Sequence, residues 1–192
     1  MFLKKFRLHR NGSIRLRYYN YAQNGYYFVT ICSKYRINIF GEIVRGKMKY
    51  NDLGLVSKKY WQQIPKHFPF VKLDEFVIMP DHVHGIIVID KQNMNTDVLD
   101  TCHDYSYEYN DARFVGARHG VRLQQRNRFG KINNGSLSVI INQYKGAITK
   151  WAHKNNIPFS WQPRYYEHVI QNEQALNNVR AYIGNNPRMW HN

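Results

Sequence analysis

Two histidines separated by one residue are the strongest sign of chemistry in the sequence. They stand in residues 79–85 (MPDHVHG), which are followed by an apolar run over 86–89. Because alternate side chains of a β-strand share a face, His82 and His84 are expected to point the same way while Val83 turns into the core. Two imidazoles on one strand face form half of a site for a divalent metal ion. The alternative is a pair of polar histidines on a partly exposed strand.

A tyrosine and an asparagine near the C-terminal end form a second candidate pair. Tyr182 and Asn186 are four residues apart in an expected helix that Pro187 ends, so they share one helical face about a turn apart. A tyrosine in this position could act as a nucleophile beside a metal ligand, the amide oxygen of Asn186. The alternative is a packing tyrosine followed by an asparagine that caps the helix.

Positive charge points to a polyanionic partner. The chain has 28 Lys and Arg against 13 Asp and Glu, and residues 1–50 hold eleven of the basic side chains and one acidic side chain, interleaved with tyrosines. Basic and aromatic side chains in alternation are typical of surfaces that follow nucleic-acid phosphates and stack on bases, although a solvated basic tail is the alternative. The candidate DNA contacts are Arg15, Arg17, Lys34 and Arg36, together with Arg164 from a strand-like segment over 161–170.

The length and composition exclude several classes of protein. A chain of 192 residues that is 43% hydrophobic suits one compact domain and is not disordered throughout. No apolar run approaches 18 residues, and the basic N-terminal segment lacks the apolar stretch of a secretory signal. Two cysteines make neither a disulfide framework nor a zinc pattern. We therefore expect a soluble, cytoplasmic domain with no membrane partner.

Strands and helices in mixed order predict an α+β fold. Alternation and β-branched residues favour strands over 26–32, twice within 37–50, and over 71–79, 82–90 and 165–171. Helical spacing and capping residues favour helices over 53–64 (ended by Pro65), 137–154 and 174–186. Such an order suggests an antiparallel sheet covered by helices on one face. Residues 91–134 break the pattern and are interpreted as a polar insertion whose basic half either holds DNA or is solvated.

Five stretches in order resemble the single-tyrosine HUH transposases, and most closely their REP-associated tyrosine transposase branch. They cover nearly all of the chain outside the insertion: residues 15–32, 77–89, 136–150, 161–170 and 182–187. The resemblance implies a ferredoxin-like antiparallel sheet with helices on one face and a catalytic C-terminal helix. It makes residues 1–192 a single HUH tyrosine transposase domain with a basic arm at 1–25 and the insertion at 91–134.

The resemblance also assigns roles to the candidate residues. His82 and His84 match the family's His-hydrophobic-His motif and are implied to be metal ligands, and Tyr182 matches its nucleophile. Asn186 stands where this branch places its third ligand, whereas the insertion-sequence branch usually has Gln there. The implied cofactor is a divalent ion, Mg²⁺ or Mn²⁺, which can polarise a phosphate and so help a phenol whose pKa in free tyrosine is about 10.

The expected activity is metal-dependent cleavage and rejoining of single-stranded or hairpin-forming DNA through a covalent 5′-phosphotyrosine, with a monomer favoured over a homodimer. One alternative is a catalytically silent hairpin or single-stranded DNA-binding protein derived from a transposase. A metal hydrolase that uses activated water is weaker, because no carboxylate is expected beside the histidines. Asp81 should face away by alternation if the strand extends that far. Tyr165 and Tyr166 remain alternative nucleophiles.

Overall fold

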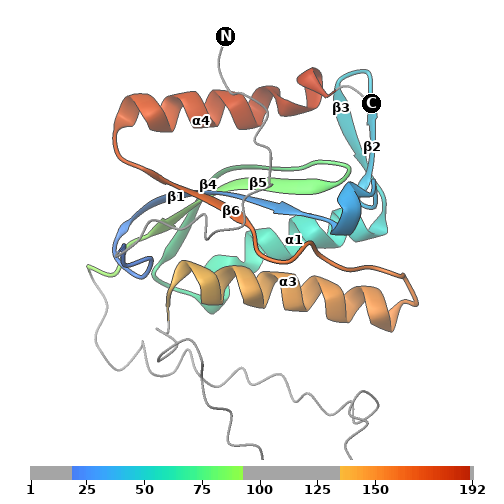
Figure 1. Cartoon of the computed structure of the whole chain (residues 1–192), viewed down its shortest axis with the longest axis horizontal. Coiled ribbons are helices and arrows are strands. Elements are labelled where there is room, and N and C mark those ends of the chain that lie inside the picture. Colours follow the sequence, from blue (N-terminus) through green and yellow to red (C-terminus); the bar gives the residue numbers. More distant parts are fainter. Residues whose placement is uncertain (1–18, 93–134, 191–192) are drawn as a thin grey trace, which may run out of the picture.

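A four-stranded antiparallel sheet forms the centre of the molecule (Figure 1). The structure, a computed structural model, describes residues 19–92 and 135–190, so most of the expected basic arm and of the expected insertion lies outside the described residues. The strand order is β4-β5-β1-β6, which places β5 and β1 in the middle. The strands are β1 (Gly25–Cys32), β4 (Val71–Ile78), β5 (His82–Ile89) and β6 (Tyr166–Ile170).

The helices lie on both faces of this sheet (Figure 1). Helices α1 (Asp52–His67) and α3 (Leu137–Lys154) cover one face, and α4 (Glu173–Asn185) lies across the other. A separate hairpin of β2 (Gly41–Val44) and β3 (Lys47–Tyr50) stands beside the end of α4. The main elements follow one another as β1-α1-β4-β5-α3-β6, the split βαβ order of ferredoxin-like domains. The expected α+β class is confirmed, with the C-terminal helix on the face that α1 and α3 leave open.

Strand alternation divides the interior into two cores. On the side of α1 and α3, Val83 and Ile87 of β5 pack with residues of β1 and both helices. On the side of α4, Phe28 and Ile86 pack with Ile183 of that helix. The even-numbered residues of β5, including both histidines, therefore face α4.

Gly85 shows how closely α1 approaches the sheet. An added Cβ there would lie 2.2 Å from Cζ2 of Trp61, a fully buried side chain of α1. Only glycine permits this contact, so the packing of α1 against β5 requires that position 85 has no side chain.

Most predicted boundaries agree with the structure, and the end of α1 differs. The helix was expected to stop before Pro65, but it continues to His67 with Pro65 in its last turn. The continuation brings Phe68 into the core, where it is buried and its N–H bonds to the carbonyl of Ile64. Burial of that aromatic side chain outweighs the loss of one helical hydrogen bond at the proline.

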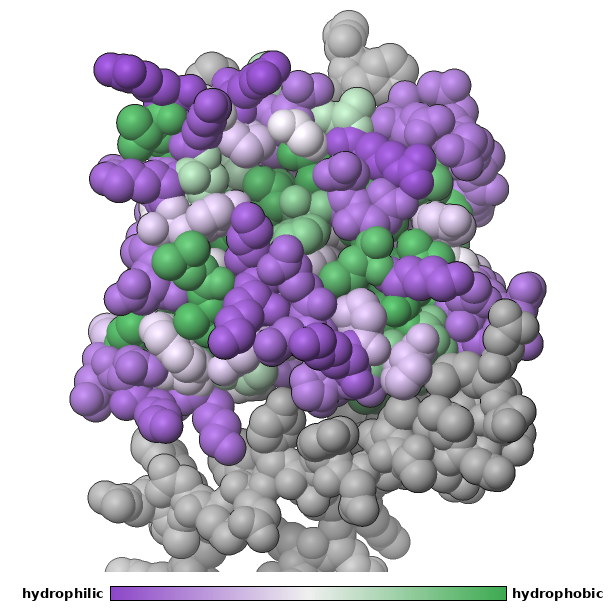
Figure 2. Space-filling model, turned by 180° about the vertical axis from the view of Figure 1, so that it is seen from behind, coloured by the Kyte–Doolittle hydropathy of each residue, from purple (hydrophilic) through white to green (hydrophobic). Residues whose placement is uncertain are grey.

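Hydrophilic residues cover most of the face seen from behind, and the apolar residues on it form separate small areas (Figure 2). No helix within residues 19–92 and 135–190 is long and apolar enough to span a membrane.

An ion pair connects α4 to the sheet. The guanidinium of Arg180 donates from Nε to Oδ1 of Asp74 at 2.9 Å and from Nη2 to Oδ2 at 2.6 Å. Asp74 lies in an irregularity of β4 between Leu73 and Phe76, where the register with β5 shifts. A two-point contact of this kind fixes orientation as well as distance, so it sets the position of α4 over β5.

Replacing Arg180 with leucine is expected to lower the stability of the protein in a pH-dependent way. The hydrogen bonds from Arg180 hold the pKa of Asp74 below its ordinary value of 3.8, so the pair stabilises the fold above that pH and ceases to do so as the carboxylate is protonated below it. Urea denaturation at pH 7 and pH 3 should show a lower midpoint for Arg180→Leu at pH 7 and a smaller difference at pH 3. Glu173→Gln is the matched control, because Glu173 also pairs with Arg180 but is exposed and at the longer distance of 3.6 Å. An equal difference at both pH values would contradict this account.

Candidate active site

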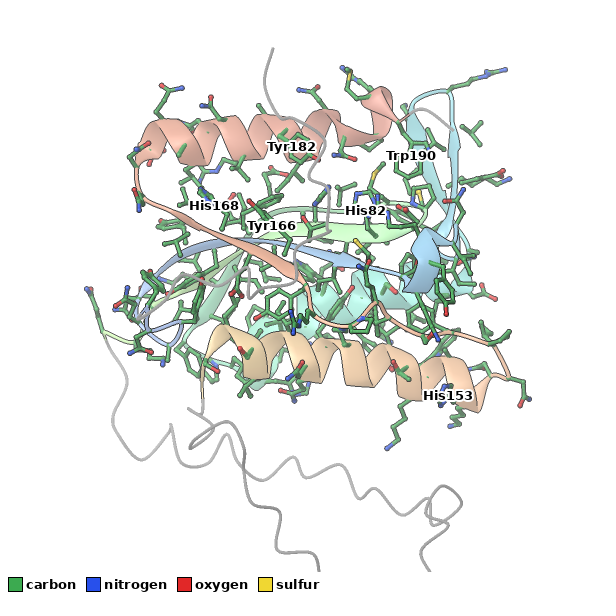
Figure 3. All side chains as sticks on the ribbon, in the orientation of Figure 1. His82, His153, Tyr166, His168, Tyr182 and Trp190 are labelled. Atoms are coloured by element: carbon green, nitrogen blue, oxygen red, sulfur yellow. The ribbon has the colours of Figure 1, made fainter. Side chains whose placement is uncertain are left out.

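The two histidines of β5 meet edge to face. His82 lies on the side of the sheet that α4 covers (Figure 3). His82 and His84 are 4% and 5% exposed, and their Nε2 atoms are 2.9 Å apart. Their side chains share a strand face, as alternation predicts, while Val83 is buried on the other side. The arrangement concentrates two potential metal-binding nitrogens at one point.

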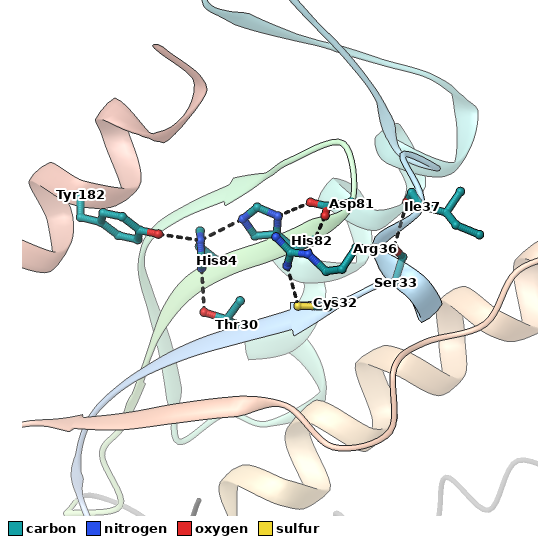
Figure 4. Close-up of polar contacts among 9 residues, drawn as sticks. All are labelled: Thr30, Cys32, Ser33, Arg36, Ile37, Asp81, His82, His84 and Tyr182. Atoms are coloured by element: carbon teal, nitrogen blue, oxygen red, sulfur yellow. Dashed lines mark hydrogen bonds and ion pairs between the residues drawn. The ribbon is translucent and has the colours of Figure 1, made fainter. Parts of the chain in front are cut away.

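Each imidazole is held through its other nitrogen (Figure 4). Nδ1 of His82 contacts the carboxylate of Asp81, and Nδ1 of His84 lies 2.8 Å from the hydroxyl of Thr30, its partner residue on β1. Outer contacts of this kind fix ring orientation and tautomer in metal-binding histidines. The sheet register thus orients His84, and the turn before β5 orients His82.

The two rings are suited to bind a cation rather than a proton. Burial lowers the pKa of His82 despite the neighbouring Asp81, and burial together with His82 lowers the pKa of His84 well below its ordinary 6.5. Both are therefore neutral at pH 7. Because a carboxylate only accepts, Nδ1 of His82 carries the proton and its Nε2 presents a lone pair toward His84. The two Nε2 atoms, 2.9 Å apart, are close enough that one divalent ion would be held by both.

Tyr182 reaches the same point from α4. Its hydroxyl is 3.2 Å from Nε2 of His84, and its ring packs edge-on against Phe28 with centroids 6.1 Å apart. The side chain is 36% exposed, so a substrate can reach the hydroxyl while the ring stays fixed. The structure thus places the hydroxyl of the predicted nucleophile beside one of the predicted metal ligands.

Asn186 is less closely tied to the site. It follows the last residue of α4 and begins a short 3₁₀ turn, η2 (Asn186–Met189), about one helical turn beyond Tyr182. Among residues 19–92 and 135–190, its side chain has no hydrogen-bond partner. Its role as a third ligand stays a prediction.

Asp81 corrects one expectation from the sequence. It was expected to face away from the histidines, but it is 3% exposed and contacts His82 directly. The strand begins at His82, so Asp81 belongs to the preceding turn, where strand alternation does not apply. A carboxylate therefore does adjoin the histidine pair.

Arg36 extends this network instead of standing free in solvent. Its Nε is 2.7 Å from Oδ2 of Asp81, and its Nη1 lies 2.8 Å from Sγ of Cys32. Its side chain is 46% exposed, so these two contacts do not enclose it. Trp190, which no sequence pattern indicated, lies near the same group, with its ring centroid 5.7 Å from that of His82.

The predicted DNA contacts within the described chain gather at one end of β1. Lys34 and Arg36 belong to a 3₁₀ turn, η1 (Lys34–Arg36), and Arg164 precedes β6. Backbone bonds from Lys34 N to Ser160 O and from Gln162 N to Cys32 O, both 2.9 Å, join these two loops. Arg15 and Arg17 lie outside the described residues. Tyr166, the alternative nucleophile, packs against Phe28 with ring centroids 6.3 Å apart.

Replacing Asp81 with asparagine is expected to weaken metal binding about 10- to 100-fold, the usual effect of losing an outer-shell partner of a ligating histidine. The amide keeps the shape but removes the charge that holds His82 and Arg36. Calorimetric titration with Mn²⁺ would measure the change, with Asp90→Asn as control because Asp90 pairs with the exposed Lys72 on the far end of β5. Equal Mn²⁺ affinities of Asp81→Asn and wild type would show that Asp81 has no such role.

Comparisons with known proteins agree with this fold. No known protein-family model matches the chain. The chain is 38% identical over 184 residues to an uncharacterized protein of Haemophilus influenzae. The match covers 95% of this chain and 91% of that protein. A REP-associated tyrosine transposase, solved bound to a REP hairpin, superposes with a TM-score of 0.52 over 91% of this chain and 72% of that chain at 16% identity. This likeness shows that the two chains share a fold.

Proposed function

The chain belongs to one family with the Haemophilus influenzae protein and has the fold of a REP-associated tyrosine transposase, and from this we propose that it cleaves and rejoins hairpin-forming single-stranded DNA. The observation that carries the proposal is the 3.2 Å contact between the Tyr182 hydroxyl and Nε2 of His84. A partly exposed tyrosine hydroxyl and two neutral imidazoles coincide at this point.

The reaction we propose is a direct transfer of a phosphate to tyrosine. The phenol oxygen of Tyr182 gives up its proton and bonds to the scissile phosphorus, and the bond from phosphorus to the 3′ oxygen breaks. The leaving 3′ oxygen takes up a proton, so the step involves no net gain or loss of protons. The products are a 5′-phosphotyrosine and a free 3′-OH, and attack by a 3′-OH on the phosphotyrosine rejoins a strand. Because the linkage keeps the energy of the phosphodiester, the strand can be rejoined without a further energy source.

His82 and His84 would hold the metal ion, with the amide oxygen of Asn186 as the proposed third ligand. A bound Mg²⁺ or Mn²⁺ would polarise the scissile phosphate and stabilise the charge that develops on it. Asp81 and Thr30 keep the two rings in position, and Arg36 holds Asp81. The packing of Phe28 against the Tyr182 ring limits the directions from which the hydroxyl can approach the phosphate.

The nucleophile and both histidines come from one chain, and this supports a monomer as the working unit. The net charge of +15 supports a nucleic acid as the partner. The transposase with the same fold was solved bound to a REP hairpin, so a hairpin is the substrate form that we propose for this chain as well. Lys34 and Arg164 would contact its phosphates, with Arg15 and Arg17 adding to the affinity.

The test is to incubate the protein with Mn²⁺ and a pool of labelled hairpin single strands, and to look on a denaturing gel for a covalent protein–DNA product. We expect a product that forms only with metal. Cleaved DNA without a covalent product would indicate hydrolysis by activated water instead. Tight binding with neither cleavage nor covalent product, in a pool containing the native repeat, would favour a DNA-binding protein that has lost the reaction.

A further inference from the structure

The turn that follows β1 has an unusual backbone. Tyr35 and Arg36 both adopt positive φ, 60° and 57°, although neither is glycine. A left-handed backbone conformation is unfavourable for a residue with a Cβ, so two in succession persist only where the surroundings impose them. The consequence is a sharp turn that sends neighbouring side chains in opposite directions.

One of these side chains points into the active site and the other into solvent. Arg36 turns inward to Asp81 and Cys32, as described above. Tyr35 is 80% exposed, the largest exposed fraction among the large hydrophobic side chains of residues 19–92 and 135–190. The strained turn therefore holds an aromatic ring in solvent, where the ring contributes nothing to the core.

The turn is packed directly on the segment that carries the histidines. Ser33 N bonds to Asp81 O at 2.9 Å, and Ile39 N bonds to Pro80 O at 2.8 Å. Cys32, at the end of β1, is the partner residue of His82. Through Arg36 and Asp81 the turn is two side-chain contacts from His82 (Figure 4). The turn that carries Tyr35 therefore lies at the end of β5 where His82 stands.

The charge around Tyr35 suits a nucleic acid. The ammonium of Lys34 lies 5.0 Å from the centroid of the Tyr35 ring. The next residue, Arg36, has a side chain that is 46% exposed. Exposed Arg164 comes from the loop that is hydrogen-bonded to the residues before the turn. Cations for phosphates beside an exposed aromatic ring for a base are the features by which proteins bind single strands.

We propose that Tyr35 is a stacking platform for an unpaired base close to the scissile phosphate. The inference rests on the proposed function, since it takes single-stranded DNA as the substrate and Tyr182 as the point of attack. Every base has a flat face, so stacking on Tyr35 holds the strand without selecting its sequence, and the neighbouring cations position its backbone.

Binding to labelled single strands, measured in the Tyr182→Phe background where no covalent product forms, tests the proposal. We expect Tyr35→Ala to weaken binding by about tenfold or more, and Tyr35→Trp to restore it. The slope of log affinity against log salt should be unchanged in Tyr35→Ala, because no phosphate contact is lost, whereas Lys34→Ala should reduce it by about 0.7. Tyr26→Ala is the matched control, since Tyr26 is 39% exposed at the opposite end of β1.

The second readout is direct. A 2-aminopurine base placed at successive positions beside the cleavage site should be quenched at one position, and Tyr35→Ala should remove that quenching. Unchanged affinity and unchanged quenching in Tyr35→Ala would overturn the proposal, even if wild-type protein forms the covalent product. Loss of both without any covalent product in the wild type would instead retain Tyr35 as a stacking residue and contradict the proposed reaction.

Discussion

Replacing Tyr182 with phenylalanine is expected to abolish the covalent protein–DNA product, with cleavage falling by about 10⁴-fold or more as for other lost nucleophiles. The change removes one oxygen, whose contact is with Nε2 of His84, and keeps the ring that packs against Phe28. The fold and the histidine pair should therefore be unaffected. A denaturing gel with labelled hairpin DNA and Mn²⁺ would measure the product, and a thermal melt would check the fold.

Tyr166→Phe is the matched control for this experiment. Tyr166 lies on β6, packs on the same Phe28 and is the nearest alternative nucleophile that the sequence offers. We expect this variant to form the product at the wild-type rate. A product that survives in Tyr182→Phe and disappears in Tyr166→Phe would move the nucleophile to β6.

His84→Ala is expected to have an effect of similar size through the metal. His84 contacts His82, Thr30 and Tyr182. Its loss removes a proposed ligand and the contact that faces the nucleophile, so Mn²⁺ affinity should fall by more than the roughly 100-fold that loss of an outer partner can cause. Metal-dependent cleavage should fall with it. Calorimetry and the gel assay on the same preparation would measure both.

The control here is His153→Ala, because His153 is exposed at the end of α3, on the far side of the sheet (Figure 3). It should bind Mn²⁺ and cleave DNA as the wild type does. If His84→Ala retained Mn²⁺ binding and cleavage, the histidine pair would have no part in the reaction, whatever the outcome for Tyr182.

The fold was largely predictable because its elements carry strong local patterns. Apolar residues at helical spacing gave the bounds of α3 correctly, and alternation along β5 predicted that both histidines share a face. Local pattern is informative where an element, such as α3, has one buried face and one exposed face. At Pro65 it failed, because burial of Phe68 in the tertiary structure extends the helix past the proline.

The site was predictable only in part. No spacing rule relates Tyr182 to His84, which are 98 residues apart, and only the resemblance to a known family implied that they meet. The contact of Asp81 with His82 was not predicted because it depends on a turn, and the contacts of Arg36 with Asp81 and Cys32 were not predicted because they depend on a strained backbone. Contacts that arise from turns and from packing between distant elements leave no periodic pattern in the sequence.

Mass spectrometry of the covalent product tests the central claim most directly. After digestion of both protein and DNA, the peptide that contains Tyr182 should carry a nucleotide joined through its 5′ phosphate to the phenol oxygen. The account predicts this modification on Tyr182, dependent on metal and absent in His84→Ala. The same nucleotide found on Tyr165 or Tyr166, or cleaved DNA with a free 5′ phosphate and no modified peptide, would contradict it.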